Sequence, residues 1–265
     1  MKMFKKTLSV ALAALTVLIC LSVSVLAADV TVKLRIEGID KCLFYGNVTV
    51  DAGATVLDVI KAADETDPNL TATIIDSDYG PYLAAVNGIV AGAYTEKKWD
   101  GWSYTVDGVS PDVGMSAFVI ESGDSILMYY GDPWNTGMQY PTLKTDKLSE
   151  GKVYVTSMDT VYDENWNASV AECAVTGYTL YWDGIKITPD ENGVCTLNEK
   201  MIEAGTHSVQ IEKYDLKTGL PTVLRFAPDF TVTVEKTQEQ EKSFFDIIKD
   251  FINMIIDFIK SLFKF

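Results

Sequence analysis

Turn dipeptides between short apolar runs fill the stretch from Gly80 to Asp132, and this pattern constrains the fold more than any other. Asn87-Gly88 and Asp107-Gly108 each separate two such runs. Type I′ hairpin turns need positive φ at both central residues, a conformation that Asn-Gly and Asp-Gly adopt readily. We therefore predict antiparallel strands here. Aromatic residues are dense on them: Tyr82, Tyr94, Trp99, Trp102, Tyr104, Phe118, Tyr129 and Tyr130.

The preceding residues predict two strands and one helix. Val30 to Ile36 alternates apolar and polar side chains, as a half-buried strand does, and residues 47–50 would form its partner. Thr55 and Asp58 form a capping box ahead of TVLDVIKAADE, whose apolar residues have helical spacing. Two strands, a helix and further strands is the element order of a β-grasp fold, so we predict the α+β class for residues 29–132.

The same stretch resembles a known family. GPYLAAVNG, then W-x-x-W-x-Y-x-V-x-G from Trp99, and finally SGD-x-I-x-x-x-Y-G from Ser122 resemble the C-terminal domain family of the transcobalamins. The resemblance covers residues 29–132. In the cobalamin carriers this domain covers one face of the corrin ring, while a large helical domain holds the other. Nothing in this sequence is typical of that helical domain.

The resemblance implies a binding site for a flat, partly apolar ligand such as a corrinoid. Tyr82, Trp99, Trp102, Tyr104 and Tyr130 would supply stacking surface, and Asn87 would hydrogen-bond the amides of the ligand. A second interpretation stays open, because Trp102 and Tyr104 are spaced by two and can both face the core of the sheet. Trp99 and Tyr82 lie nearer loops.

The second half of the chain predicts a separate all-β domain. Residues 133–151 contain prolines and glycines without periodicity and are interpreted as a linker. Short strands and regular turns over 152–236, with the first strand ending near Ser157, favour a small β-sandwich. The segment YTLYWDGIKITPDENGVCTL resembles bacterial Ig-like and carboxypeptidase-regulatory-like repeats. Cys173 and Cys195 could form a disulfide there, or they could be two small thiols.

The two ends of the chain predict where it acts. Residues 1–28 have the basic start, apolar run and small-residue end of a secretory signal peptide, with cleavage near Ala27 or Ala28. We therefore expect an extracellular, cell-surface protein. Ser243–Phe265 predicts an amphipathic helix whose polar side chains occupy one arc of roughly 120°. Its wide apolar face would bind a membrane surface or mediate self-association.

Motifs for catalysis are missing from the sequence. His207 is the only histidine, and it falls in a predicted strand without a nucleophile motif or a zinc-ligand cluster. The formal charge of −15, or −18 without the signal peptide, disfavours nucleic acid as a partner. We expect no enzyme activity, no cofactor and no metal. The function predicted is a secreted or cell-surface ligand-binding protein, with cobalamin or another corrinoid as ligand; the alternative is an adhesive or structural surface protein without a small-molecule ligand.

Overall fold

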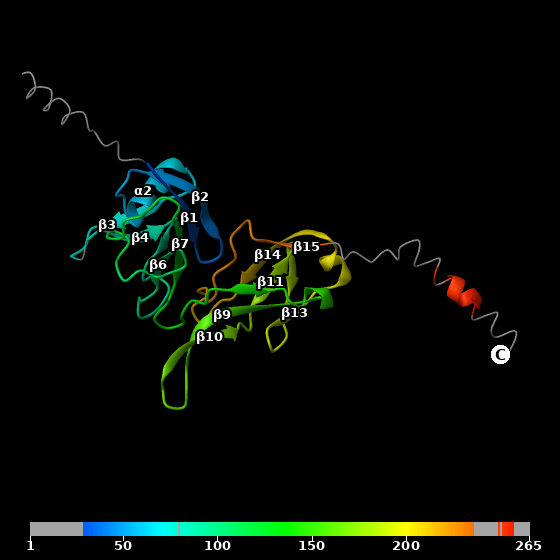
Figure 1. Cartoon of the computed structure of the whole chain (residues 1–265). Helices are drawn as coiled ribbons and strands as arrows, with labels where there is room; N and C mark the ends of the chain where they lie inside the picture. Colours follow the sequence, from blue (N-terminus) through cyan, green and yellow to red (C-terminus); the bar gives the residue numbers. More distant parts are fainter. Residues whose placement is uncertain (1–28, 79, 236–248, 250, 257–265) are drawn as a thin grey trace, which may run out of the picture. The chain divides into compact units, whose positions relative to one another are not determined.

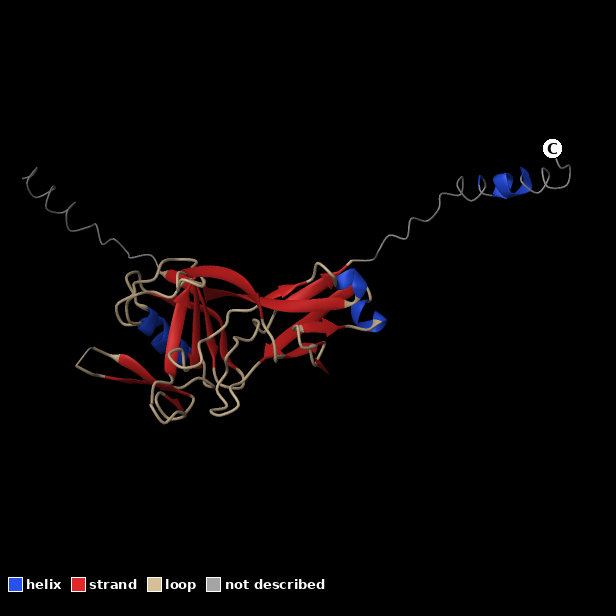
Figure 2. Cartoon of the chain, turned by 90° about the horizontal axis from the view of Figure 1, so that it is seen from below, coloured by secondary structure: helices blue, strands red, loops and turns tan. Residues whose placement is uncertain are grey.

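The computed structural model describes residues 29–78, 80–235, 249 and 251–256 (Figure 1). Strands far outnumber helices among these residues (Figure 2), and they gather into four sheets within the described ranges. The predicted signal peptide over 1–28 lies outside them. Of the predicted helix over 243–265, residues 249 and 251–256 are described, and they are helical. No helix among the described residues is long and apolar enough to cross a membrane.

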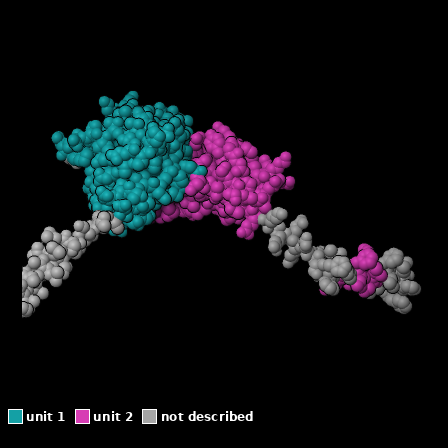
Figure 3. All heavy atoms as spheres, turned by 90° about the horizontal axis from the view of Figure 1, so that it is seen from above, with its two compact units in different colours: residues 1–140, 213–228 teal, residues 141–212, 229–265 magenta. Residues whose placement is uncertain are grey.

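The chain divides into two compact units, each built from two separate stretches of sequence (Figure 3). The first unit comprises Met1–Tyr140 and Lys213–Pro228, and the second comprises Pro141–Glu212 and Asp229–Phe265. The sequence had predicted one uninterrupted second domain over 152–236. In the structure, residues 213–228 belong instead to the first unit.

A four-stranded sheet with the order β2-β1-β7-β6 forms the body of the first unit. Strand β1 (Val30–Glu37) runs antiparallel to β2 (Cys42–Val50) and parallel to β7 (Ser125–Gly131). Strand β6 (Gly101–Val106) pairs antiparallel with β7. A smaller antiparallel sheet holds β3 (Ala72–Ile75), β4 (Tyr82–Val86) and β5 (Ile89–Val90).

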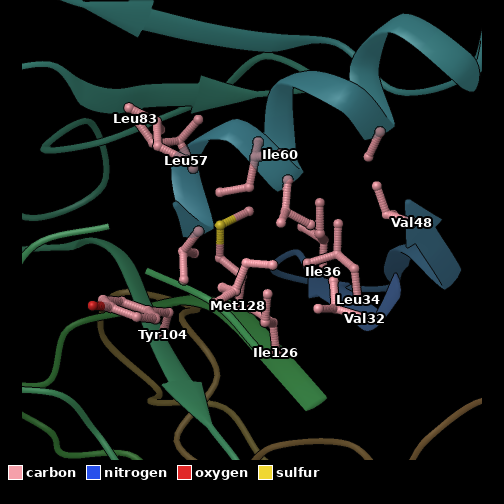
Figure 4. Packing of buried hydrophobic residues seen from close by; sticks show 14 of the residues in the cluster. Val32, Leu34, Ile36, Val48, Leu57, Ile60, Leu83, Tyr104, Ile126 and Met128 are labelled. Carbon is pink, nitrogen blue, oxygen red and sulfur yellow. The ribbon is translucent and has the colours of Figure 1, made fainter. Parts of the chain in front are cut away.

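Helix α2 (Val56–Thr66) supplies the apolar layer that the main sheet packs against. Its capping box is present: the Thr55 side chain accepts from the Asp58 amide, and the Asp58 carboxylate accepts from the Thr55 amide at 3.0 Å. The buried stripe of the helix belongs to the same core as the inward side chains of β1 and β7 (Figure 4). That core includes Val56, Leu57, Val59, Ile60, Ala63, Val32, Leu34, Ile36, Ile126 and Met128.

The predicted turns are confirmed by their backbone angles. Asn87 and Gly88 have φ values of 48° and 79°, and Asp107 and Gly108 have values of 50° and 78°. These are the paired positive angles that an Asn-Gly or Asp-Gly turn provides with little strain. Local sequence therefore fixed where the chain reverses direction in this unit.

Residues 213–228 belong to the first unit and are anchored there by ionic contacts and hydrogen bonds. Leu220, Val223, Leu224 and Phe226 are buried. Arg225 Nε donates to the Glu37 carboxylate at 2.9 Å, and Arg225 Nη2 forms an ion pair with the same carboxylate at 2.6 Å. The Arg35 guanidinium donates to the same carboxylate at 2.7 Å and to the Phe226 carbonyl at 2.9 Å. These charge-assisted bonds hold the returning segment against the end of β1.

The second unit agrees with the predicted all-β sandwich, since it has two four-stranded sheets around buried apolar residues. One sheet contains β8 (Thr142–Lys144), β9 (Lys152–Tyr162), β10 (Ala168–Ala174) and β13 (Val194–Thr196). The other contains β11 (Thr179–Trp182), β12 (Ile185–Ile187), β14 (Gly205–Glu212) and β15 (Thr231–Val234). Two 3-10 helices lie at Leu148–Glu150 and Glu199–Ile202. The predicted linker over 133–151 thus contains β8 and the first 3-10 helix, and β9 continues five residues beyond Ser157.

The disulfide considered for Cys173 and Cys195 is wrong, because both are free thiols. Cys173 pairs with Ser157 of β9, whereas Cys195 pairs with Val153 of the same strand. Four residues along a strand correspond to about 13 Å. A disulfide needs Cα atoms within about 7 Å, so the bond cannot form in this arrangement.

Candidate functional site

An aromatic cleft of about 720 Å³ lies on the first unit. Its walls come from four places in the chain: the start of β4, the middle of β6, the loop over 110–116, and the end of β7 with the turn after it. The lining residues are Ser77, Gly80, Pro81, Tyr82, Leu83, Trp102, Ser103, Tyr104, Ser110, Pro111, Gly114, Met115, Ser116, Tyr129, Pro133 and Trp134.

Three of the rings in this cleft are fixed by hydrogen bonds to neighbouring groups. The Trp102 indole donates to the Ile89 carbonyl at 3.2 Å, and its ring meets Tyr130 edge-on at 5.1 Å. The Tyr104 hydroxyl donates to the Val113 carbonyl at 2.7 Å. The Tyr129 hydroxyl bonds that of Tyr140 at 2.9 Å. Trp102 and Tyr104 therefore pack against the core of the unit and also line the cleft.

Two further rings project into solvent at the cleft. Tyr82 is 44% exposed, and Trp134 is 81% exposed. Trp134 also borders a second hollow of about 280 Å³ together with Trp99, which is 52% exposed and has the Lys97 ammonium 4.7 Å above its ring. Because exposed rings lose water on contact with a flat apolar ligand, they are the part of the site with most to gain from binding.

Trp134 was not among the predicted site residues, because its Asp-Pro-Trp-Asn segment was interpreted as linker. The structure explains how it is positioned. The buried Asp132 carboxylate accepts from the Asn135 side chain at 2.8 Å and from the Asn135 amide at 3.3 Å. The Asp132 carbonyl accepts from the Thr136 amide at 3.0 Å. This bonded turn displays the tryptophan, and its place directly after Pro133 was a local, non-periodic signal for it.

Asn87 and Tyr130 do not line the cleft. The Asn87 side chain accepts from the Thr71 amide at 2.7 Å and donates to the Asn69 carbonyl at 2.9 Å, so it joins two loops. Tyr130 is fully buried and donates to the Val90 carbonyl at 2.7 Å and to the Asp100 carboxylate at 2.6 Å. Both residues thus hold neighbouring segments in place and do not contact the cleft themselves.

Asp100 organises the loop that carries Trp99. Its buried carboxylate accepts from the amides of Tyr94 and Thr95 at 2.9 and 3.1 Å, and from the hydroxyls of Thr95 and Tyr130. Burial opposes the ionisation of Asp100, but these hydrogen bonds outweigh it and hold its pKa below the usual value. The loop is therefore anchored by a charged group that lies beneath it.

The cleft carries no formal charge at neutral pH. None of its lining residues is an acid or a base. Burial raises the pKa of the Tyr104 phenol, and burial together with the Tyr140 hydroxyl raises the pKa of Tyr129. Both phenols stay protonated, so the site offers rings, hydroxyls and backbone groups in a chain that is otherwise strongly acidic. Such a lining favours an uncharged ligand over a phosphate or another compact ion.

No group of three or more His, Cys, Asp or Glu side chains suited to a metal occurs in the part of the chain that the structure describes. His207 lies in the second unit, where its Nδ1 bonds the Asp183 carboxylate at 2.7 Å and its Nε2 bonds the Glu203 carbonyl at 2.8 Å. Both ring nitrogens are thus engaged in structural contacts.

Comparisons with known proteins complete the description. A family model described as "Domain of unknown function (DUF4430)" matches residues 53–132, which is less than half of the chain. No curated protein matches the chain. The chain is similar to haptocorrin in a complex with Cbi, at 20% identity and a TM-score of 0.35; the match covers 39% of this chain and 25% of haptocorrin. It is also similar to a "putative metal binding protein" from Ruminococcus gnavus ATCC 29149, at 14% identity and a TM-score of 0.29, covering 38% and 95%. These likenesses are too weak to carry an argument about the ligand.

Proposed function

We propose that the aromatic cleft of the first unit binds a flat, uncharged, partly apolar small molecule. The observation that carries this proposal is the combination of five rings, four serines and no charged side chain around one cleft of about 720 Å³. Small-molecule sites usually have about 300–1,000 Å³ and combine apolar walls with a few polar groups. Tyr82 and Trp134 provide exposed stacking surface, while Trp102 and Tyr104 provide a fixed floor.

A corrinoid is the specific ligand that we propose. The sequence resemblance to the transcobalamin C-terminal domain family motivates it, and the chemistry of the cleft is compatible with it. The corrin ring presents a broad, mostly apolar face bordered by neutral amides. Serine hydroxyls can bond those amides, and Trp134 can stack on the ring. An open cleft of this size suits contact with one face of the ring.

We further infer a β-grasp arrangement for the first unit and an extracellular binding role without catalysis. The parallel pairing of β1 with β7 and the single helix packed on the main sheet support the β-grasp proposal. The sequence of residues 1–28 supports secretion, and the structural engagement of His207 argues against its use as a catalytic base. The apolar face predicted for 243–265 supports membrane association or self-association of the tail.

Equilibrium dialysis of the purified protein against cyanocobalamin and cobinamide tests the corrinoid proposal. We expect saturable retention, and a rise of about 5–10 °C in the melting temperature of the first unit at 100-fold excess over Kd. Trp134→Ala should weaken binding by about tenfold, since lost stacking is worth about 1.4 kcal/mol. Trp166→Ala is the matched control, because Trp166 is 82% exposed but lies in the other unit. No retention at high micromolar ligand would refute the proposal that the ligand is a corrinoid. Equal loss of retention in both variants would refute the proposal that the ligand binds in the cleft.

The second candidate function is a surface protein that binds another macromolecule. It is favoured by one observation outside the cleft: exposed apolar side chains concentrate on the hairpin formed by β9 and β10. A protein with this second function would not retain cyanocobalamin. Its binding to the macromolecular partner would depend on that hairpin.

A further inference from the structure

Strands β9 and β10 extend beyond the rest of their sheet as a two-stranded arm. The register pairs Thr156 with Ala174 at the base and Tyr162 with Ala168 near the tip. The other partners of β9, strands β8 and β13, pair only with residues 152–156. In Figure 1 the two strands run on together past the sheet that holds their base. We call residues 157–173 the β-arm. An isolated two-stranded ribbon is only marginally stable in water. A surface that packs against the β-arm would therefore stabilise it.

One face of the β-arm is apolar and exposed. Met158 and Tyr162 are 62% and 61% exposed on β9, and Val170 is 67% exposed on β10. Register places Val170 opposite Thr160, between those two residues, so all three side chains share one face. Single apolar residues are normal on a surface, but three exposed ones on one face of a protruding hairpin, beside Thr160 and Glu172, mark an interaction site.

The tip of the β-arm displays a tryptophan on a fixed loop. The Asp163 carboxylate accepts from the amides of Asn165 and Asn167 at 2.8 and 2.9 Å, and from the Asn167 side chain at 2.8 Å. Trp166 has φ of 64°, a left-handed conformation that costs a bulky residue about 1–2 kcal/mol. Its ring is 82% exposed and lies 6.2 Å from the Tyr162 ring. The loop therefore holds two neighbouring rings toward solvent.

The charge of the β-arm selects among possible occupants. Residues 153–185 contain five acids and no Lys or Arg, and four of those acids belong to the arm: Asp159, Asp163, Glu164 and Glu172. A second copy of the arm would bring like charges together. Anionic lipid headgroups would also be repelled. A basic partner would be attracted, and its Lys or Arg side chains could additionally stack on Trp166, the ring type that binds cations best.

The outer edge of β10 offers main-chain groups for such a partner. Ala168–Ala174 has small side chains, no proline, no lysine and one charge, Glu172, which forms an ion pair with Lys144. Within the described residues β10 pairs only with β9, so its other edge is open to strand addition. Natural sheets usually protect an edge with lysine, proline or a bulge, and none of these stands in β10.

We propose that the β-arm docks a basic, partly apolar segment of another protein, which adds to the edge of β10 as an extended strand. Main-chain hydrogen bonds along β10 would supply affinity, as in other cases of strand addition. Alternate side chains of the segment would supply specificity: apolar ones cover Met158 and Val170, while cationic ones reach Trp166 and the arm's carboxylates.

Fluorescence anisotropy of labelled peptides tests this docking on the full chain. The probe is an acetylated peptide of four Lys-Val repeats, and its control has four Glu-Val repeats. We expect the Lys-Val probe to bind and the Glu-Val control to fail. Trp166→Ala should weaken the probe by about 5–30-fold, the loss of one desolvated cation–π contact. Val170→Lys should weaken it, because this substitution removes an apolar contact and adds a repelling charge. Trp134→Ala, in the cleft, should leave probe binding unchanged.

Several outcomes would overturn the proposal. Equal binding of both peptides would remove the role of charge, and equal losses in Trp166→Ala and Trp134→Ala would remove the role of the arm. Sedimentation velocity showing a dimer that Trp166→Ala dissociates would assign the arm to a second copy. Trp166-dependent co-sedimentation with phosphatidylcholine vesicles would assign it to a membrane. The result is independent of the cyanocobalamin experiment, because the two sites are tested by different tryptophans.

Discussion

Glu37→Gln should destabilise the first unit strongly, because this substitution removes the charge that joins its two stretches of sequence. The Glu37 side chain is 3% exposed, accepts one hydrogen bond each from Arg35 and Arg225, and forms a further ion-pair contact with Arg225 Nη2. The two arginine side chains are themselves only 15% and 10% exposed. Glutamine keeps the volume of glutamate, so the change tests the charge and not the packing.

The expected loss is about 3–5 kcal/mol of unfolding free energy, the usual effect of removing one partner from a buried ion pair. It arises mainly from leaving two guanidinium groups out of water without a counter-charge. The arginine bonds to the carbonyls of Gly38, Ile39 and Phe226 remain and limit the loss. Since the total stability of a domain is about 5–15 kcal/mol, the variant should unfold at clearly lower urea.

Urea titration followed by tryptophan fluorescence measures this effect, and limited proteolysis at Lys213 and Lys217 reports release of the returning segment. Glu172→Gln is the matched control, because Glu172 also pairs with a basic residue but is exposed. Exposed ion pairs contribute little, so its midpoint should hardly move. A midpoint for Glu37→Gln that corresponds to less than about 1 kcal/mol, or cleavage no faster than in the parent protein, would refute the role assigned to the carboxylate.

Three further predictions concern the second unit. Hydrogen bonding to Asp183 raises the pKa of His207, so protonated His207 stabilises the folded unit. This stabilisation is complete below the unfolded pKa of 6.5 and is lost as pH rises through the folded pKa. Melting temperatures measured across pH 5–9 should therefore fall as pH rises from 6.5 through the folded pKa, and His207→Gln should abolish this dependence. Gly193→Ala should cost at least about 3 kcal/mol by thermal melting, because its Cβ would lie 2.2 Å from a carbonyl oxygen, while Gly184→Ala, with open space, should cost about 1 kcal/mol. Maleimide labelling of the native protein should modify Cys173 before the buried Cys195, and reductant should leave the melting temperature unchanged. A fall in melting temperature on reduction would show that a disulfide is present.

Local chemistry made the first unit largely predictable. The alternation over Val30–Ile36, the capping box at Thr55 and the positive-φ turns are each encoded within a few residues, and all appear in the structure. The return of residues 213–228 was not predictable in this way. Arg225 meets Glu37 across more than 180 residues, and no periodic pattern in a proline-containing loop reports a partner so distant.

The candidate site was also predictable only in part. Tyr82, Trp102 and Tyr104, which the family resemblance suggested as stacking residues, line one cleft. Trp134 was missed because turn residues carry no periodic signal for burial or display. The outer half of β9 was missed because its apolar side chains alternate in a strand that has neither face fully buried, and sequence patterning assumes that one face is.

The two-part construction of the first unit has a consequence for protein synthesis. A ribosome completes residues up to Tyr140 and must then make residues 141–212 before Lys213–Pro228 can emerge. At about 5–20 residues per second this interval lasts roughly 4–14 s. Throughout it, the nascent unit lacks Arg225 and the apolar residues Leu220 and Leu224, so the end of β1 stays open to water, chaperones and proteases. Completion of the first unit is thus tied to synthesis of a second unit that contributes no residue to the aromatic cleft.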